Sequence, residues 1–195
     1  MKKLLFVSQC LVFLLYLCAC TGIRELSAAE LQEIENYLND DVNNGFICYN
    51  TYTRPEEISL RDVFYDGAGV RRNTPLSDEE RAYFGEKEYL LSFLSYVTHE
   101  DAEKVVREKL GIPMSEVYTS FEKTDGYIAS FDKLFYSHSD CQYCFIEVLS
   151  GHTDELGRYV IEYQDNSHEE PDFKAVVTLN KVGNIYQFVS NAIIH

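Results

Sequence analysis

The chain contains 195 residues, of which 32 are acidic and 17 are basic, so its formal net charge is −15 near neutral pH. Such a charge repels the phosphate backbone of nucleic acids, and we therefore expect no nucleic-acid partner. An acidic surface that keeps the protein soluble is the simplest explanation, although the charge also favours a cationic partner or a metal ion.

The chain begins with a segment that is typical of export. Lys2 and Lys3 precede an apolar run from Leu4 to Leu17, as in a secretory signal. The run is interrupted by two polar residues and is shorter than the roughly 20 apolar residues of a membrane-spanning helix. We therefore expect residues 1–19 to be a cleaved signal and not a permanent membrane anchor.

The signal ends in Leu17-Cys18-Ala19-Cys20, which resembles the lipobox of bacterial lipoproteins. That motif consists of an aliphatic residue, two small residues and the cysteine that receives the lipid. The resemblance implies cleavage after Ala19 and a thioether-linked diacylglycerol on the sulfur of Cys20. Since two acyl chains bind a bilayer stably, it also implies a protein held on the extracytoplasmic side of the cell membrane.

Cleavage after residue 19 would leave 176 of the 195 residues and, by removing Lys2 and Lys3, would change the formal charge from −15 to −17. That length fits one domain. We expect residues 20–26 to be the lipidated cysteine and a short tether, and residues 27–195 to form a single domain. Six extended residues reach roughly 20 Å, so the domain should lie close to the membrane.

The first half of the mature chain predicts helices. Ser27 begins a capping-box pattern followed by apolar residues at helical spacing, which indicates a helix over about 28–40. Whether the apolar run at 46–52 forms a helix or a strand is left open. Pro55 suits the first turn of a short helix that ends in a glycine-rich turn.

Two further helices are expected. Ser77 begins another capping box, and its apolar residues continue to Leu94, with Gly85 as a point where this helix divides. Thr98 begins the next helix, and Gly111 ends it.

After Pro113 the chain becomes rich in β-branched and aromatic residues, with polar turns between the runs, as in antiparallel strands. The expected strands are Gly126–Phe131, Leu134–Tyr136, Cys144–Leu149, Tyr159–Tyr163, Phe173–Leu179 and Ile185–Ile194. We therefore predict an α+β domain with N-terminal helices packed on one face of a C-terminal antiparallel sheet of about four strands.

This order of elements over residues 98–195 looks like the cystatin and NTF2-like superfamily of small α+β domains. The stretches Leu60–Gly69 and Tyr186–Asn191 also resemble uncharacterised Gram-positive lipoproteins of about this size. The first resemblance implies a fold, and neither implies a known activity.

Three cysteines remain after export. Cys10 and Cys18 leave with the signal, Cys20 takes the lipid, and Cys48, Cys141 and Cys144 stay in the domain. Three cysteines allow at most one intramolecular disulfide and leave one thiol over. This excludes a disulfide-based scaffold, while the state of Cys141 and Cys144 is left open.

His138, Asp140, Cys141 and Cys144 form a cluster of possible metal ligands. Zinc takes four such ligands. Because the sequence has no second C-x-x-C pair, a further sulfur ligand would have to come from Cys48. A redox pair would need to lie at a helix N-terminus, whereas this one enters an expected strand. An ordinary hairpin corner is the preferred interpretation, and a metal or thiol role is the alternative.

A repeated His-x-Asp pattern occurs at His138–Asp140 and His152–Asp154. Two imidazoles and two carboxylates suit a transition metal. The expected strand between the motifs holds them about 23 Å apart, however, so we expect solvated loops. The same interpretation applies to His99 and His168, each of which precedes acidic residues.

The chain has 15 tyrosines, 12 phenylalanines and no tryptophan. Tyrosines such as Tyr159 and Tyr163 on one sheet face are able to stack against sugars or peptides. Without tryptophan, packing between the sheet and the helices is the preferred interpretation.

The sequence lacks a G-x-S-x-G elbow, an H-E-x-x-H motif, a phosphate-binding loop and a dinucleotide fingerprint. We therefore expect a non-catalytic, lipid-anchored binding or interaction domain without a cofactor, whose ligand is a small molecule, a peptide or a neighbouring envelope protein. The alternative is an extracytoplasmic metal- or thiol-dependent protein that uses His138, Asp140, Cys141 and Cys144. A purely structural or immunity-type lipoprotein is a third possibility.

Overall fold

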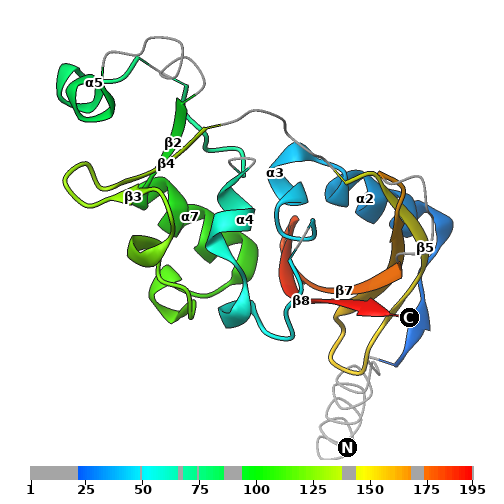
Figure 1. Cartoon of the computed structure of the whole chain (residues 1–195). Coiled ribbons are helices and arrows are strands. Elements are labelled where there is room, and N and C mark those ends of the chain that lie inside the picture. The colour runs from blue at the N-terminus through cyan, green and yellow to red at the C-terminus, as the bar shows by residue number, and fades with distance from the viewer. Residues whose placement is uncertain are drawn as a thin grey trace, which may run out of the picture.

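A computed structural model (Figure 1) describes residues 22–48, 50–65, 68–73, 75–85, 94–137, 144–167 and 174–194. The expected signal and the expected lipidation site at Cys20 lie outside these residues. Within the described ranges, no helix has both the length and the apolar character needed to cross a membrane.

The α+β class predicted from the sequence is confirmed, with most helices in the first half of the chain. The helices are α2 (Ala28–Leu38), α3 (Asp41–Asn44), α4 (Leu60–Tyr65), α5 (Asp78–Phe84) and α7 (His99–Leu110), with 3-10 turns η1 (Pro55–Glu57), η2 (Met114–Glu116) and η3 (Phe121–Lys123). The strands are β1 (Arg24–Glu25), β2 (Leu94–Thr98), β3 (Tyr127–Ile128), β4 (Lys133–Ser137), β5 (Ile146–Thr153), β6 (Tyr159–Asp165), β7 (Lys174–Val182) and β8 (Ile185–Ile194).

The larger sheet has the order β1-β5-β6-β7-β8, and every neighbouring pair is antiparallel. Four of its strands form the expected meander. Figure 1 shows this sheet strongly curled, with α2 and α3 across its open side. Irregularities in register at 148–150 and 178–179 contribute to the curvature, because a bulge bends and twists a strand locally. β5 continues to Thr153, four residues beyond the expected end of this strand at Leu149.

The start of the domain differs from the prediction that residues 20–26 are a tether. Arg24 lies opposite Thr153 in the sheet, and the backbone N–H of Leu26 donates to the carbonyl of Gly151 at 2.9 Å. The side chain of Leu26 is buried. Residues 24–26 therefore belong to the folded domain, and the tether predicted from the sequence ends at Ile23.

A second sheet, of order β2-β4-β3, was not predicted as a separate unit. Leu94 was expected in a helix but begins β2, because its segment Leu94–Thr98 pairs residue by residue with β4. Alternate side chains of β2 face different partners: Val97 joins the main core, whereas Tyr96 packs with Phe135 in a smaller cluster. α7 contributes to the first cluster, and the end of α5 packs against the second.

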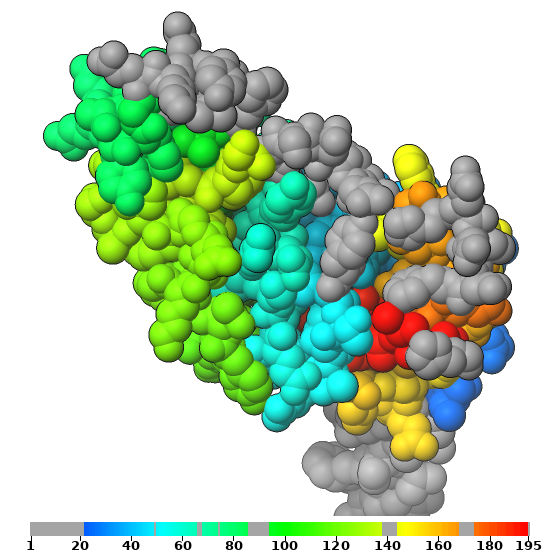
Figure 2. Space-filling model, viewed as in Figure 1, coloured from blue at the N-terminus to red at the C-terminus, as the bar shows by residue number. Residues whose placement is uncertain are grey.

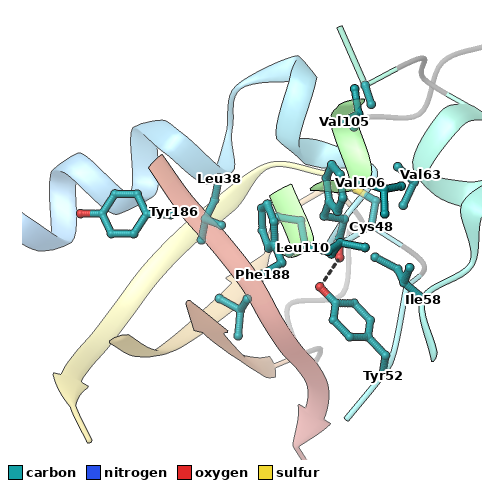
Figure 3. Close-up of a cluster of buried hydrophobic side chains, with 14 of the residues drawn as sticks. Leu38, Cys48, Tyr52, Ile58, Val63, Val105, Val106, Leu110, Tyr186 and Phe188 are labelled. Carbon is teal, nitrogen blue, oxygen red and sulfur yellow. Dashed lines mark hydrogen bonds between the residues drawn. The ribbon is translucent and has the colours of Figure 1, made fainter. Parts of the chain in front are cut away.

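One continuous core connects the two sheets. Figure 3 shows Leu38 from α2, Val106 and Leu110 from α7, and Phe188 from β8 close together beneath the helices. Tyr52 enters the same core and donates its hydroxyl hydrogen to the carbonyl of Phe46 at 3.1 Å. Burial of these apolar side chains is the main stabilising contribution, at roughly 1.5–3 kcal/mol for each large one.

The helix ends follow local sequence signals. Ser27 forms the expected capping box at the start of α2. Thr98 accepts a hydrogen bond from the backbone of Asp101 at the start of α7, and Gly111 ends that helix with φ of 73°. The short helix expected from Pro55 is instead divided into η1 and α4, because Ile58 between them is extended.

Candidate functional site

A disulfide joins the segment after α3 to the segment before β5. It links Cys48 to Cys144, which are 96 positions apart in the sequence and have a Cα–Cα distance of 5.9 Å. Both residues are buried, at 2% and 7% exposure. Of the three cysteines whose pairing the sequence leaves open, these two are therefore bonded, while Cys141 lies outside the described residues.

A buried asparagine fixes the same corner. The side-chain amide of Asn44 donates to the carbonyl of Cys144 at 3.1 Å, and its oxygen accepts the Cys144 backbone N–H at 2.9 Å. Asn44 is 1% exposed. Its amide therefore takes the place of a neighbouring strand, which satisfies backbone groups that burial would otherwise leave unpaired.

Asn39, the C-cap residue of α2, and Glu35 within that helix continue this pattern along β5. Asn39 makes the same pair of bonds to the backbone of Ile146, both at 2.8 Å. Glu35 accepts the backbone N–H of Val148 at 2.8 Å. Alternate residues along this side of β5 are thus hydrogen-bonded by side chains, which explains how a helix and a strand hold the corner rigidly.

A small open pocket of about 290 Å³ lies at this corner. It is lined by Asn39, Asp41, Cys144, Phe145, Ile146 and Asn166. The ring of Phe145 is 67% exposed and therefore offers apolar surface beside the pocket. The pocket thus combines an exposed aromatic ring with the carboxylate of Asp41.

The two asparagines of the pocket already have hydrogen-bond partners. Asn39 binds Ile146 as described, and Asn166 donates to the carboxylate of Glu147 at 2.9 Å. Asn39 and Asn166 therefore form part of the pocket wall, whereas Asp41 supplies a negative charge and Phe145 supplies apolar surface. The arrangement suits a small group with an ammonium or guanidinium next to an apolar part.

Only Cys144 of the predicted cluster of metal ligands lies in the part of the chain that the structure describes. His138, Asp140 and Cys141 lie outside the described residues, and the sulfur of Cys144 is bonded to Cys48. A disulfide sulfur is not a thiolate, which is the form that binds zinc. In the part of the chain that the structure describes, no group of three or more histidine, cysteine, aspartate or glutamate side chains could hold a metal.

The second His-x-Asp motif has a structural role at its acidic residue. Asp154 accepts the backbone N–H groups of Leu156 and Arg158, both at 2.9 Å, and forms an ion pair with the Arg158 guanidinium at 2.7 Å. Partial burial raises the pKa of Asp154, but these hydrogen bonds lower it more, so the net pKa is below its ordinary value. The carboxylate therefore shapes the β5–β6 turn.

The motif at His99 lies at the start of α7, directly after β2. His99 contacts Glu122 at 3.3 Å, and the neighbouring Asp101 binds Arg72 at 2.6 Å. Asp101 thus stabilises the start of α7, as Asp154 stabilises the β5–β6 turn. His168 lies outside the described residues.

The two tyrosines singled out in the sequence pack in the core. Tyr163 is 1% exposed and donates its hydroxyl hydrogen to Asn191 at 2.9 Å. Burial raises its pKa well above the ordinary value. Tyr159 is half-buried and packs edge to face on Tyr186, with ring centroids 5.4 Å apart. This agrees with the core-packing interpretation.

Sequence reasoning missed the role of the asparagines. Besides Asn39 and Asn44, the buried Asn191 donates to the carbonyls of Ile47 and Asn50, at 3.1 and 2.7 Å. The available signal was the density of asparagines around the apolar run at 46–52, whose irregular backbone needs such partners.

No protein-family model matches the chain, and no curated protein and no solved structure is significantly similar to it. The resemblances to bacterial lipoproteins and to the cystatin and NTF2-like superfamily therefore stay predictions.

Proposed function

We propose that this protein is exported, anchored by a lipid on Cys20 to the extracytoplasmic side of the cell membrane, and serves as a non-catalytic binding domain. The observation that carries the proposal is the Cys48–Cys144 disulfide in the core. Disulfides persist in oxidising compartments and are rare in the cytosol. The bond therefore supports the export that the signal and the lipobox resemblance imply.

The pocket beside the disulfide supports binding in preference to catalysis. Among the residues that the structure describes, those lining the pocket include one carboxylate, a cysteine that is already bonded and no histidine. Acid–base or nucleophilic catalysis needs an activated group paired with a proton acceptor. We propose that the pocket binds a cationic group next to an apolar one, through Asp41 and Phe145, which the net charge of −15 also favours.

The anchor is tested by expressing the full chain in a bacterium with radiolabelled palmitate. We expect label in the membrane fraction for the wild type and none for Cys20→Ser. Alkylation before reduction should modify Cys141 but not Cys48 or Cys144. An unlabelled wild-type protein, or free thiols at Cys48 and Cys144 after export, would contradict the proposal.

The pocket is tested by NMR titration of the exported domain with 2-phenylethylamine, which has an aromatic ring and an ammonium group. We expect shifts at Phe145 and Asn166, and weaker binding in Asp41→Asn. Tyr118→Ser is the matched control, because Tyr118 is a similarly exposed aromatic residue, at 65%, and does not line the pocket. Equal binding of the amine and of neutral ethylbenzene would contradict a cationic ligand.

A further inference from the structure

The register of the larger sheet brings three parts of the chain to one end. Arg24 pairs with Thr153 at the end of β5, and Thr153 pairs with Tyr159 at the start of β6. Tyr159 in turn pairs with Leu179, near the turn between β7 and β8. We call this the hairpin end of the sheet: it comprises Ile23 and the β5–β6 and β7–β8 turns.

The start of the described chain lies beside the β5–β6 hairpin in both Figure 1 and Figure 2. In Figure 1 the β5–β6 hairpin lies beside the blue start of β1, at the bottom of the view. Figure 2 shows the gold and blue atoms next to each other along the same lower edge of the surface. The described chain therefore begins at the hairpin end.

Each part of the hairpin end carries an exposed apolar side chain. Ile23 is 66% exposed, Leu156 in the β5–β6 turn is 74% exposed, and Val182 at the β7–β8 turn is 51% exposed. A polar residue would serve equally well in an exposed turn, and turns favour polar residues. Apolar side chains gathered where the chain begins indicate a surface that contacts something apolar.

Ion pairs reduce the charge around these side chains. The basic residues Arg24, Arg158 and Lys181 each contact a carboxylate, at 2.8, 2.7 and 2.8 Å respectively. Paired charges repel anionic headgroups less than the net charge of the whole chain suggests. The hairpin end is therefore better suited to a lipid surface than a uniformly acidic face.

We propose that Ile23, Leu156 and Val182 insert into the interfacial layer of the membrane that carries the lipid on Cys20. The proposal rests on the proposed function, because it takes the lipidated Cys20 as the anchor. Cys20 lies four positions before Arg24 of the sheet, and four steps of extended chain span at most about 14 Å. The hairpin end must then face the bilayer at close range.

This orientation determines where the pocket points. β5 runs from Ile146, beside the pocket, to Thr153 at the hairpin end. At about 3.3 Å per residue, its length is roughly 23 Å. The pocket therefore lies at the end of the sheet away from the membrane, where it is open to ligands from outside.

Tryptophan fluorescence tests the contact, because the natural chain has no tryptophan. The lipidated protein is reconstituted into phosphatidylcholine–phosphatidylglycerol vesicles with and without brominated acyl chains. We expect the emission of Leu156→Trp to be blue-shifted and quenched several-fold by the bromolipid. Val182→Trp should behave in the same way. In contrast, Tyr83→Trp, on the exposed surface of α5, should be quenched little.

Flotation of the same vesicles separates the two proposals. If the protein floats with the vesicles but Leu156→Trp, Val182→Trp and Tyr83→Trp are quenched equally, the membrane contact is wrong and the anchor stands. If the wild-type protein does not float, the lipid anchor itself is wrong, and the contact falls with it.

Discussion

Asn44 and Cys144 are 100 positions apart, yet the side-chain amide of Asn44 donates to the backbone C=O of Cys144 and accepts from its backbone N–H. Four residues after Asn44, Cys48 adds a covalent bond to the same Cys144. A single turn of chain is thus fixed to the start of β5 in two independent ways. The two contributions are separable by mutation.

Removing the disulfide should destabilise the domain substantially. The bond closes a loop of 96 residues, and a loop of about that length is associated with roughly 3–5 kcal/mol of stability, because the cross-link restricts the unfolded chain. We expect Cys48→Ser/Cys144→Ser to lower the free energy of unfolding by that amount in urea denaturation of the exported domain. Cys141→Ser is the control. If it destabilises the domain as much as the double variant, the pairing is wrong.

Asn44→Ala should be costly although it removes only a few atoms. The substitution removes the partner of the buried C=O of Cys144 and leaves its N–H with only the sulfur of Cys48, at 3.1 Å; an unsatisfied buried group costs about 1–3 kcal/mol. We expect a loss of about 2–4 kcal/mol, measured by urea denaturation with the disulfide intact. Asn36→Ala, at an exposed position of α2, should change stability by less than about 0.5 kcal/mol. Equal effects of the two variants would show that the amide bonds contribute nothing.

Gly45→Ala should disrupt the contact between the α3 turn and α4. Gly45 has φ of −64°, which alanine adopts freely. A Cβ there, however, would lie 2.6 Å from the carbonyl oxygen of Val63. Since backbone must move, we expect about 1–3 kcal/mol of destabilisation. Gly85→Ala meets no atom within 4 Å, but the φ of 78° and ψ of 161° at this residue are nearly exclusive to glycine, so its cost should come from the backbone alone, at about 1–3 kcal/mol. A neutral Gly45→Ala would mean that this packing is loose.

Acid should weaken the attachment of β1 to α2. The Arg24 guanidinium, hydrogen-bonded to Glu30, lowers the pKa of that carboxyl to about 2, and the backbone and hydroxyl of Ser27 add to the effect. Because the folded-state pKa lies below the ordinary 4.5, this stabilisation is fully present above pH 4.5 and is lost as the pH falls toward 2.

The measurement is the urea midpoint between pH 6 and pH 2.5, with the Glu30 carboxyl followed by NMR. The Glu30→Gln variant should show a shallower loss of stability with acid than the wild type. If both proteins lose stability in parallel, the pair has no role in the acid response.

Elements that depend on neighbouring residues could be predicted from the sequence. The capping box at Ser27 and the cap at Thr98 are local patterns, and both helices begin there. Over most of their length, the long strands β7 and β8 alternate buried residues with more exposed ones, along a sheet whose two faces differ. These features are encoded within a few residues, so distant contacts did not alter them.

Features that depend on distant partners could not be predicted. The apolar run ending at Leu94 fits a helix or a strand equally well, and pairing with β4, some 40 residues later, decides for a strand. Three cysteines permit three different pairings, and only the fold brings Cys48 next to Cys144. In the sequence, Asn39 and Asn44 look like ordinary turn residues. Their role becomes visible only when the fold places the chain at Cys144 and Ile146 against them.

The side chains that bind β5 have a further consequence for the protein's neighbours. An edge strand with open N–H and C=O groups accepts a strand from another molecule. Along β5, Glu35, Asn39 and Asn44 already occupy such groups, and β1 covers the last two residues of the strand. On the proposed lipid anchor, copies of the protein would be concentrated in one plane, where an open edge of β5 would be able to pair with another copy. The side chains that hold the corner together therefore also protect this edge of β5 from pairing with a strand of another molecule.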